Sequence, residues 1–595
     1  MTRIMRLASR PFAIPAQRRN SHLLHLRLPP GRAWLIKGLM FLAFAALALR
    51  ALWIQGITTG FYQRQGDLRF VRTIELPAMR GRILDRHGNI LASSIPVKTI
   101  WADPQTLQAD PRQVDELAAL LQIDAGTLRQ RFAQDQLQFV YVKRQVDVDT
   151  ARKVAALHIK GVYMSPSYRR FYTEGAAAAQ LLGFTDIENQ GRGGLELEFQ
   201  RVLAGHAGTR KVMRDRLGNV IEDVEGGTPP VNGQDVQLSI DSKIQDLTYQ
   251  ALEKAVKASH AKNASAVVLD AATGEVLAMA NYPSFDPNKR SGYTNADMRN
   301  YALTDIYEPG SVIKPLTIAA ALQDGVVTMR SMFQTAPGCM LMYGNRICDD
   351  SDNGTIGLPQ VIQYSSNVAT GQIVMRMKPQ EQWDMYTAVG LGQRPQLPFP
   401  GQASGRLRPW KRWRPIDAVT QGFGYGLAVS TFQLAHAYLV FADDGVIRPA
   451  TLFKTAQPAP AVRVISARVA ADVRSMLALV TSPQGTAKAA RIPGYSTGGK
   501  TGTAYIWRGK AYDKHEFRAQ FVGMAPIDHP RLVMAVSVDQ PDAKMHFGGQ
   551  VAAPVFSEVV GQALRMLGVP PDLPVQPEVP PAQPVVARAG AGAGA

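Results

Sequence analysis

The chain has 595 residues, more than a single hydrophobic core usually spans, so several domains are expected. A content of 46% hydrophobic and 19% charged residues excludes a mostly disordered chain and a protein made mainly of membrane-spanning helices. Two cysteines are too few for a disulfide-dense scaffold or a four-cysteine zinc site, and a net charge of +18 has to be interpreted by its location.

Residues 1–32 are predicted to form a basic tail. Every charged side chain in this segment is an arginine, and no acidic residue precedes the next predicted element. A large part of the positive charge is therefore concentrated in the tail, and we expect no nucleic-acid partner.

Residues 33–55 predict one transmembrane helix. The apolar run has the length of about 20 residues that crosses a bilayer. Lys37 and Arg50 lie near its ends, and Trp34 and Trp53 suit the two interfaces. Because the arginines precede the helix, the N-terminus is expected in the cytoplasm and the rest of the chain on the opposite side.

A cleaved signal peptide, with Gly38–Leu49 as its apolar region, is the alternative to an uncleaved anchor. The preceding tail is long for a signal peptide, and the small residues Ala46 and Ala48 lie inside the apolar run. The anchor is therefore favoured.

Beyond the anchor, we expect a domain of short strands and amphipathic helices over residues 56–234, which begins with a polar connector. Gly226–Pro230 is typical of a boundary near its end. A second domain, residues 235–568, begins with a predicted helix at Ser242–Ser259 and two strands at Ala264–Leu269 and Glu275–Ala280.

Strand patterns return at Gln520–Met524 and Arg531–Val538, after a helix-rich middle. Strands at both ends of the domain predict an α+β fold, in which one sheet is assembled from distant parts of the chain with helices against it. Residues 569–595, rich in Pro, Ala and Gly, are predicted to be a disordered tail.

The first chemical motif is Ser311-Val312-Ile313-Lys314. Pro315 is tolerated only near the start of a helix, so it predicts a helix that begins close to Ser311. Ser311 and Lys314 then share one helix face, and the backbone N–H groups at the helix start suit a developing oxyanion. Serine needs a neighbouring base to become a nucleophile, and lysine can serve when burial and nearby positive charge lower its pKa. Lys500 is the predicted second cation.

Ser259-His260-Ala261-Lys262 has the same spacing. It ends a lysine-rich helix instead of opening an apolar one, so a solvated helix end is the favoured interpretation.

Two segments offer the additional hydroxyl and amide side chains that a site around Ser311 and Lys314 needs. Ser351–Asn353 lies in a run of turn-forming residues and is best explained as a loop. Ser365–Asn367 lies between two helical stretches, Leu358–Tyr364 and Val368–Met375. A turn between helices holds side chains more rigidly, so Ser365 and Asn367 are favoured.

The third motif is Lys500-Thr501-Gly502-Thr503. On a strand at a sheet edge, it offers hydroxyls and a cation to a carboxylate, and its glycine leaves room for an extended peptide. Gly494–Thr501 also satisfies the phosphate-loop pattern of nucleotide-binding proteins. That loop needs a strand before it and a helix after it, and neither is predicted here.

Cys339 and Cys348 flank Tyr343-Gly344 symmetrically. A two-residue hairpin turn there would place the cysteines directly opposite each other, which favours a disulfide. Two buried free thiols remain the alternative.

The three motifs, in this order, resemble those of penicillin-recognising serine enzymes, and the chain is similar to class B penicillin-binding proteins. The resemblance spans about residues 33–567 and is greatest for the septal, cell-division type. It includes five further segments: Arg80–Ala92, Arg170–Gly175, Gly193–Glu196, Gly422–Leu427 and Gly548–Phe556. The cysteine segment 338–348 departs from the general family pattern, and Thr173 replaces an expected proline.

The resemblance implies a transpeptidase domain, an antiparallel sheet with helices on both sides, on an elongated α+β pedestal of the dimerisation type (residues 56–234). It implies a peptidoglycan D,D-transpeptidase that β-lactams inhibit, with Ser311 as nucleophile and Lys314 as base. Ser365, Asn367 and Lys500 would be catalytic, and Thr501, Gly502 and Thr503 would bind substrate, with no metal or cofactor.

The implied location is a bacterial inner membrane, with the catalytic domain in the periplasm. A membrane-embedded glycosyltransferase and other division proteins are the implied partners. An elongation-type enzyme, a β-lactamase and a non-enzymatic division scaffold or β-lactam sensor are the alternatives.

Overall fold

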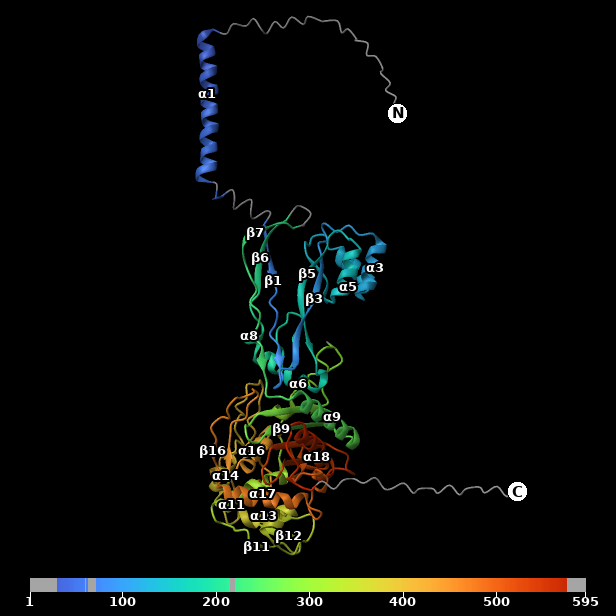
Figure 1. Ribbon diagram of the computed structural model, residues 1–595, viewed down its shortest axis with the longest axis vertical. Helices are drawn as coiled ribbons and strands as arrows, with labels where there is room; N and C mark the ends of the chain where they lie inside the picture. Colours follow the sequence, from blue (N-terminus) through green and yellow to red (C-terminus); the bar gives the residue numbers. More distant parts are fainter. Residues whose placement is uncertain (1–28, 59, 62–70, 215–219, 290, 575–595) are drawn as a thin grey trace, which may run out of the picture. The chain divides into compact units, whose positions relative to one another are not determined.

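The computed structural model describes residues 29–58, 60–61, 71–214, 220–289 and 291–574 (Figure 1). The basic tail up to residue 28, residues 59 and 62–70 of the polar connector and the tail from residue 575 lie outside the described residues. The chain divides into two compact units, one within residues 1–74 and 210–227 and the other within residues 75–209 and 228–595. The predicted boundaries at residues 234 and 568 stay predictions.

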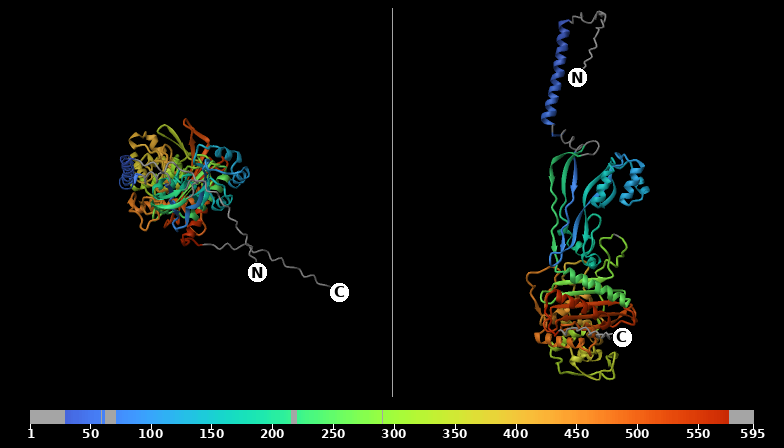
Figure 2. Two further views of the ribbon diagram at one scale, coloured as in Figure 1. Left: turned by 90° about the horizontal axis from the view of Figure 1, so that it is seen from above. Right: turned by 45° about the vertical axis from the view of Figure 1, so that its right-hand side comes forward.

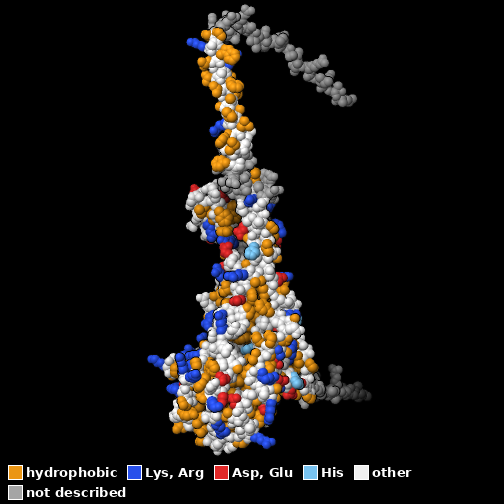
Figure 3. Space-filling view, turned by 90° about the vertical axis from the view of Figure 1, so that its left-hand side faces the viewer, with side chains coloured by type: hydrophobic (Ala, Val, Ile, Leu, Met, Phe, Trp, Pro, Cys, Tyr) orange, Lys and Arg blue, Asp and Glu red, His pale blue; other side chains and the backbone are white. Residues whose placement is uncertain are grey.

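The first unit contains the predicted apolar helix. Helix α1 (Pro30–Leu52) continues into a π-helical turn, η2 (Trp53–Ile57). It begins earlier than residue 33 because proline is well suited to the first helical position. The helix is long and apolar enough to cross a membrane, none of it is buried, and hydrophobic side chains cover its surface (Figure 3). The same unit holds most of a three-stranded sheet of order β1-β6-β7, formed by β1 (Val71–Leu76), β6 (Gly208–Arg214) and β7 (Val220–Thr228).

The second unit begins with a five-stranded sheet. Its longest ladder pairs β3 (Ile90–Ala102) with β5 (Val162–Tyr172), and the order β4-β3-β2-β8 completes it. The other strands are β2 (Ile83–Leu84), β4 (Val140–Val146) and β8 (Val236–Gln237). Three helices pack on this sheet through a small apolar core of their own: α3 (Pro111–Leu121), α4 (Ala125–Phe132) and α5 (Val148–Ala156).

A buried ion cluster joins three segments of this region. Glu196, in α7 (Gly194–Glu198), is fully buried, and its two carboxylate oxygens accept hydrogen bonds of 2.6 Å from Arg80 Nε and Arg170 Nε. Arg80 also donates to Gln200 Oε1 (2.8 Å), and Arg170 donates to the Gly81 carbonyl (2.7 Å). Glu196 thus offsets one of the two guanidinium charges, and hydrogen bonds to all three side chains lower the cost of burying them.

The Glu196→Gln substitution should destabilise the protein by about 3–5 kcal/mol, because it leaves two buried guanidinium groups without a counter-charge. The midpoint of urea unfolding of the detergent-solubilised protein measures this loss. Asp115→Asn is the matched control, since its exposed pair with Arg129 is worth about 1 kcal/mol or less. Equal effects of the two substitutions would contradict a structural role for the buried cluster.

The large antiparallel sheet of the second unit is assembled from both ends of its domain, as predicted. Its order is β10-β9-β19-β18-β17, so β17 lies at one edge. The strands are β9 (Asn263–Asp270), β10 (Val276–Tyr282), β17 (Gly498–Trp507), β18 (Tyr512–Ala525) and β19 (Leu532–Asp539).

Helices cover both faces of this sheet, as expected (Figure 2). Ser265 is in register with Gln520 through β19, and its hydroxyl bonds Thr431 of α16 (Thr431–Ala442) at 2.8 Å. Phe521 follows Gln520, so it points to the opposite face, where it packs on Phe556 of α18 (Gly548–Met566). The predicted helix Ser242–Ser259 is α9, which also packs on α18.

The remaining elements connect these layers. They are η3 (Gly175–Ala177), α6 (Ala179–Leu182), α8 (Gln200–Leu203), α10 (Tyr301–Thr304), η4 (Gly310–Ile313), α11 (Lys314–Gln323), β11 (Met332–Gln334), β12 (Cys339–Met342), β13 (Asn345–Cys348), β14 (Thr355–Gly357), α12 (Leu358–Gln363), α13 (Asn367–Val374), α14 (Pro379–Ala388), η5 (Trp410–Arg412), α15 (Pro415–Gly422), β15 (Val446–Ile447), β16 (Val462–Arg463), α17 (Ala467–Thr481) and η6 (Lys488–Ala490).

Candidate active site

Ser311 and Lys314 lie where a short 3-10 turn becomes a helix. Ser311 is in η4, and Lys314 is the first residue of α11, so the expected helix start is present with a tighter first turn. Gly310 has a positive φ of 56°, and its N–H donates to the Gly424 carbonyl (3.1 Å). A Cβ on Gly424 would lie 2.0 Å from the Gly310 carbonyl oxygen, so this contact requires glycine. The Gly422–Leu427 segment therefore supports the turn that carries Ser311.

Lys314 is fully buried, and its ammonium is directed at Ser365. Nζ donates to the Ser365 carbonyl and, at 3.2 Å, to Ser365 Oγ. Burial lowers the pKa of Lys314 from 10.5 to about 7, although Asp349 and Asp350 act in the opposite direction. A large fraction of Lys314 is thus uncharged near neutral pH, which suits a general base.

Ser365 occupies the turn between α12 and α13, with a positive φ of 60° that serine rarely adopts. Its hydroxyl accepts a second hydrogen bond, from Lys500 Nζ at 2.9 Å. The rejected candidate, Ser351, lies in an exposed loop and bonds Asn353, so the structure places Ser365 between the lysines.

Lys500 is also fully buried, and its Nζ donates to the Thr501 carbonyl (2.9 Å) as well as to Ser365. Its pKa is well below 10.5, first because of burial and then because of the charge of Lys314. Of the two causes expected from the sequence, burial and a second cation, burial is the leading cause of the lowered pKa of Lys314. The two lysines are buried and donate to one acceptor, Ser365 Oγ, so their protonation states are coupled.

Thr501, Gly502 and Thr503 continue along β17, the edge strand. Thr501 Oγ1 is 2.9 Å from Thr486 Oγ1, and Thr503 Oγ1 accepts from the Gly548 N–H (3.2 Å). A Cβ on Gly502 would lie 3.0 Å from the Val312 side chain, so glycine allows η4 to approach the strand closely.

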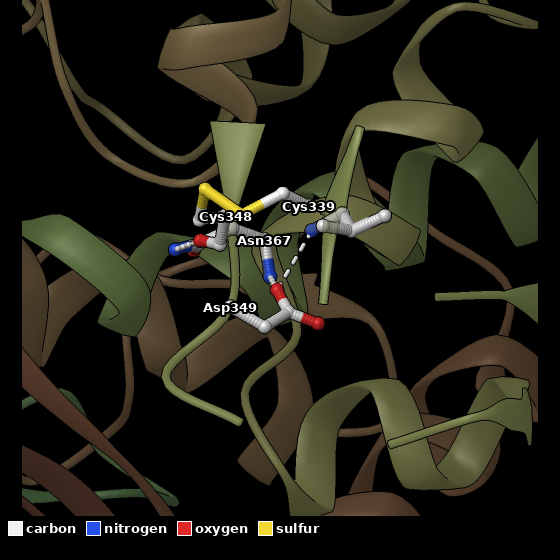
Figure 4. Close-up of a disulfide and its surroundings, with 5 residues drawn as sticks. Cys339, Cys348, Asp349 and Asn367 are labelled. Carbon is white, nitrogen blue, oxygen red and sulfur yellow. Dashed lines mark hydrogen bonds between the residues drawn. A yellow bond between two sulfur atoms is a disulfide. The ribbon is translucent and has the colours of Figure 1, made fainter. Parts of the chain in front are cut away.

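Asn367 begins α13, and its Nδ2 donates to the Cys348 carbonyl at 3.0 Å. Asp349 caps the same helix: its carboxylate accepts from the Asn367 N–H, the Val368 N–H (2.9 Å) and the Ser366 hydroxyl (2.6 Å). Cys339 and Cys348 form a disulfide (Figure 4). Asp349 belongs to the run of turn-forming residues around Ser351–Asn353, and no sequence motif pointed to its role at the start of α13.

Most of the predicted site residues border one cleft of about 700 Å³. Its lining includes Ser311, Ser365, Asn367, Thr501 and Thr503, while Lys314 and Lys500 lie buried behind Ser365. The sequence motifs did not identify part of the lining: Asp350, Tyr364, Gly485, Thr486, Lys488, Ala489, Tyr505 and Phe547.

The two alternative motifs of the sequence, Ser259–Lys262 and the phosphate-loop pattern, do not form catalytic or phosphate sites of their own. Lys262 follows the end of α9, as expected of a helix end. The segment Gly494–Thr501 runs into β17, which turns back into β18, so no helix follows to bind a phosphate.

The chain belongs to the penicillin-binding protein transpeptidase family. The family described as the penicillin-binding protein transpeptidase domain matches residues 264–561, and the penicillin-binding protein dimerisation domain matches residues 75–238. Among curated relatives, the probable peptidoglycan D,D-transpeptidase PenA of Neisseria gonorrhoeae is 38% identical over 92% of this chain and 94% of its own. The peptidoglycan D,D-transpeptidase FtsI of Escherichia coli is 37% identical over 92% of this chain and 94% of its own.

Solved structures agree with this assignment. The transpeptidase domain of penicillin-binding protein 3 from Burkholderia pseudomallei is 52% identical, with a TM-score of 0.53, and the match covers 57% of this chain and 98% of that one. Penicillin-binding protein 3 from Mycobacterium tuberculosis, solved in complex with aztreonam, is 30% identical with a TM-score of 0.65, over 84% and 99% of the two chains. The predicted family and fold class are confirmed.

Acylation of Ser311 by a penicillin should depend on pH through Lys314. Because the pKa of Lys314 is lowered to about 7, its basic form is populated above that pH and lost below it. We expect the rate to fall about tenfold per pH unit below 7 and to level off above it. The time course of labelling by a fluorescent penicillin measures this rate.

The Lys314→Arg variant also tests whether Lys314 is the base that takes the proton from Ser311. Arginine stays charged throughout, so the rate should fall by about 10²-fold or more at every pH. A flat pH profile in the native protein, or an active arginine variant, would contradict Lys314 as the base.

Proposed function

We propose that this protein cross-links peptidoglycan stem peptides as a serine D,D-transpeptidase at the division septum. The observation that carries the proposal is the Ser365 hydroxyl held between two buried lysines, in the cleft that Ser311 also lines. The relatives named D,D-transpeptidases, FtsI and PenA, support the reaction and its septal role.

Acylation begins at Ser311. Its hydroxyl attacks the carbonyl carbon of the D-Ala-D-Ala bond, and Lys314 takes the proton as the bond forms. The backbone N–H groups of Ser311 and Thr503 form the oxyanion hole, with Ser311 in the first turn before α11. Lys314 meets the requirement for a base because burial keeps it partly neutral.

The terminal carboxylate of the stem peptide binds Thr501 and Thr503, both of which line the cleft. A bound carboxylate favours the charged form of Lys500, and that charge in turn disfavours a proton on Lys314. Substrate binding thus favours the neutral form of Lys314, and in the substrate complex the charge of Lys500 contributes to this effect.

Ser365 relays a proton to the departing D-alanine, since its hydroxyl contacts both ammonium groups. Asn367 holds the peptide backbone by its side-chain amide, and the edge of β17 pairs with the extended peptide. An amine from a neighbouring stem peptide then attacks the acyl carbon. The bond from Ser311 Oγ to that carbon breaks, and the amine proton passes through Lys314 to Ser311 Oγ, which leaves the cross-link as an amide and the serine free. A β-lactam acylates Ser311 in the same way but leaves no vacated site for the amine.

The apolar helix α1 anchors the protein in a membrane. We place the N-terminus in the cytoplasm and the catalytic domain in the periplasm, at the inner membrane, because the arginines precede the helix. A membrane-embedded glycosyltransferase supplies the glycan strands, and other division proteins contact the anchor and the pedestal.

Fluorescent penicillin should label the native protein covalently: intact-mass analysis should show one adduct per chain, and fragment masses after proteolysis should place it on Ser311. The Ser311→Ala variant should show none because the nucleophile is gone, while the loop variant Ser351→Ala should label as the native protein does. An adduct that persists for hours supports a transpeptidase, and rapid turnover would indicate a β-lactamase. A folded native protein without any adduct would contradict the proposed function.

Depletion of the protein in its host should give filamentous cells, because septal cross-linking stops while elongation continues. Light microscopy during depletion measures this outcome. Complementation by the native chain but not by Ser311→Ala is the control for catalysis. Round cells would instead assign the protein to elongation, and normal division with Ser311→Ala would indicate a scaffold.

A further inference from the structure

The disulfide closes a small hairpin beside the cleft. Strands β12 and β13 pair only with each other among the described residues, with Cys339 directly opposite Cys348 and Cα atoms 4.1 Å apart. Tyr343 and Gly344 form the turn, both with positive φ. An isolated two-stranded hairpin is only marginally stable, so the covalent bond at its open end holds the two strands in register.

From Cys348, at the end of the hairpin that the disulfide joins, the chain continues directly into the candidate active site. The Cys348 carbonyl accepts from Asn367 Nδ2, and Asp349, the next residue, binds the first turn of α13 (Figure 4). Two consecutive residues thus make four hydrogen bonds to the segment Ser366–Val368, which follows Ser365.

One of these bonds sets the orientation of a functional side chain. A carbonyl only accepts, so the Asn367 amide must present its nitrogen to Cys348. That nitrogen carries a second N–H, which is available to a carbonyl of a bound peptide. The position of the Cys348 carbonyl therefore decides which atoms of Asn367 face the cleft.

We propose that the Cys339–Cys348 disulfide is a positioning element for acylation: it holds the Cys348 carbonyl and Asp349 where they orient Ser365 and Asn367 for attack by Ser311. The inference rests on the proposed function. The two cysteines touch no reacting atom and act through Asn367 and Asp349.

The chain contains only these two cysteines, so a variant or reagent that breaks the bond acts at a single place. The Cys339→Ser/Cys348→Ser variant should fold, with an unchanged far-ultraviolet circular dichroism spectrum. Its second-order rate constant for acylation by benzylpenicillin should be about tenfold lower, because the reacting groups are held less well. Leu341→Ala, at an exposed position on the same hairpin, should acylate at the native rate.

A double-mutant comparison separates positioning from general stability. Asp349→Asn also removes a charge that raises the pKa of Lys314, so the comparison is made well above pH 7, where Lys314 is mainly in its basic form. There Asp349→Asn should slow acylation, and in the protein without the disulfide it should cause little further loss, since both changes act through the same contacts to α13. Independent, multiplicative losses would overturn the proposal, as would a native rate in the folded double-serine variant.

Reduction of the native protein gives the same test without a substitution. Dithiothreitol supplies two electrons and two protons to convert the disulfide to two thiols and is itself oxidised to a cyclic disulfide. After removal of the reagent without air, the rate should fall as in the double-serine variant, which should itself be unaffected by the treatment. If the double-serine variant fails to fold, this measurement decides: an unchanged rate in the reduced, folded protein overturns the proposal. Absence of any adduct in the untreated protein would instead overturn the proposed function.

Discussion

The site depends on one oxygen atom, Ser365 Oγ, which accepts a hydrogen bond from each of two buried lysines. Burying two ammonium groups side by side is unfavourable, and the protein limits the cost by lowering both pKa values, so that the pair is not fully charged. The carbonyls of Ser365 and Thr501 and the hydroxyl of Thr501 accept the remaining bonds. Both lysines thus have lowered pKa values and share a hydroxyl through which a proton can pass, as the proposed acylation requires.

The position of Ser311 also requires close contact between three segments that are distant in sequence: its own turn, the segment around Gly424 and strand β17. Gly502 leaves space for the turn that carries Ser311, and Gly424 allows a second segment to contact Gly310 from another direction. Because β17 is the edge strand, its outer backbone groups remain available to an extended peptide. The same strand thus carries Lys500 and is the edge at which we propose that the peptide binds.

Several local features were predictable because their signals are local. Helix α9 has the predicted bounds, since Asp241 caps its first turn and His260 ends it in a left-handed conformation. The hairpin turn at Tyr343-Gly344 places the cysteines opposite each other, as their symmetric spacing indicated. The role of Asp349 was not predictable, because its partners at the start of α13 follow 17–19 residues later and only the folded chain brings them together.

The sequence by itself determined the apolar helix, the family and the residue types that carry the chemistry, because spacing and hydrophobic pattern act along the chain. Only the tertiary structure decided that Ser365, and not Ser351, lies between the lysines, and that burial is the main cause of the lowered pKa of Lys314. Ser365 is separated from Lys314 by 51 positions and from Lys500 by 135. Proton transfer depends on distances of about 3 Å, and contacts between residues so far apart in sequence are set by packing alone.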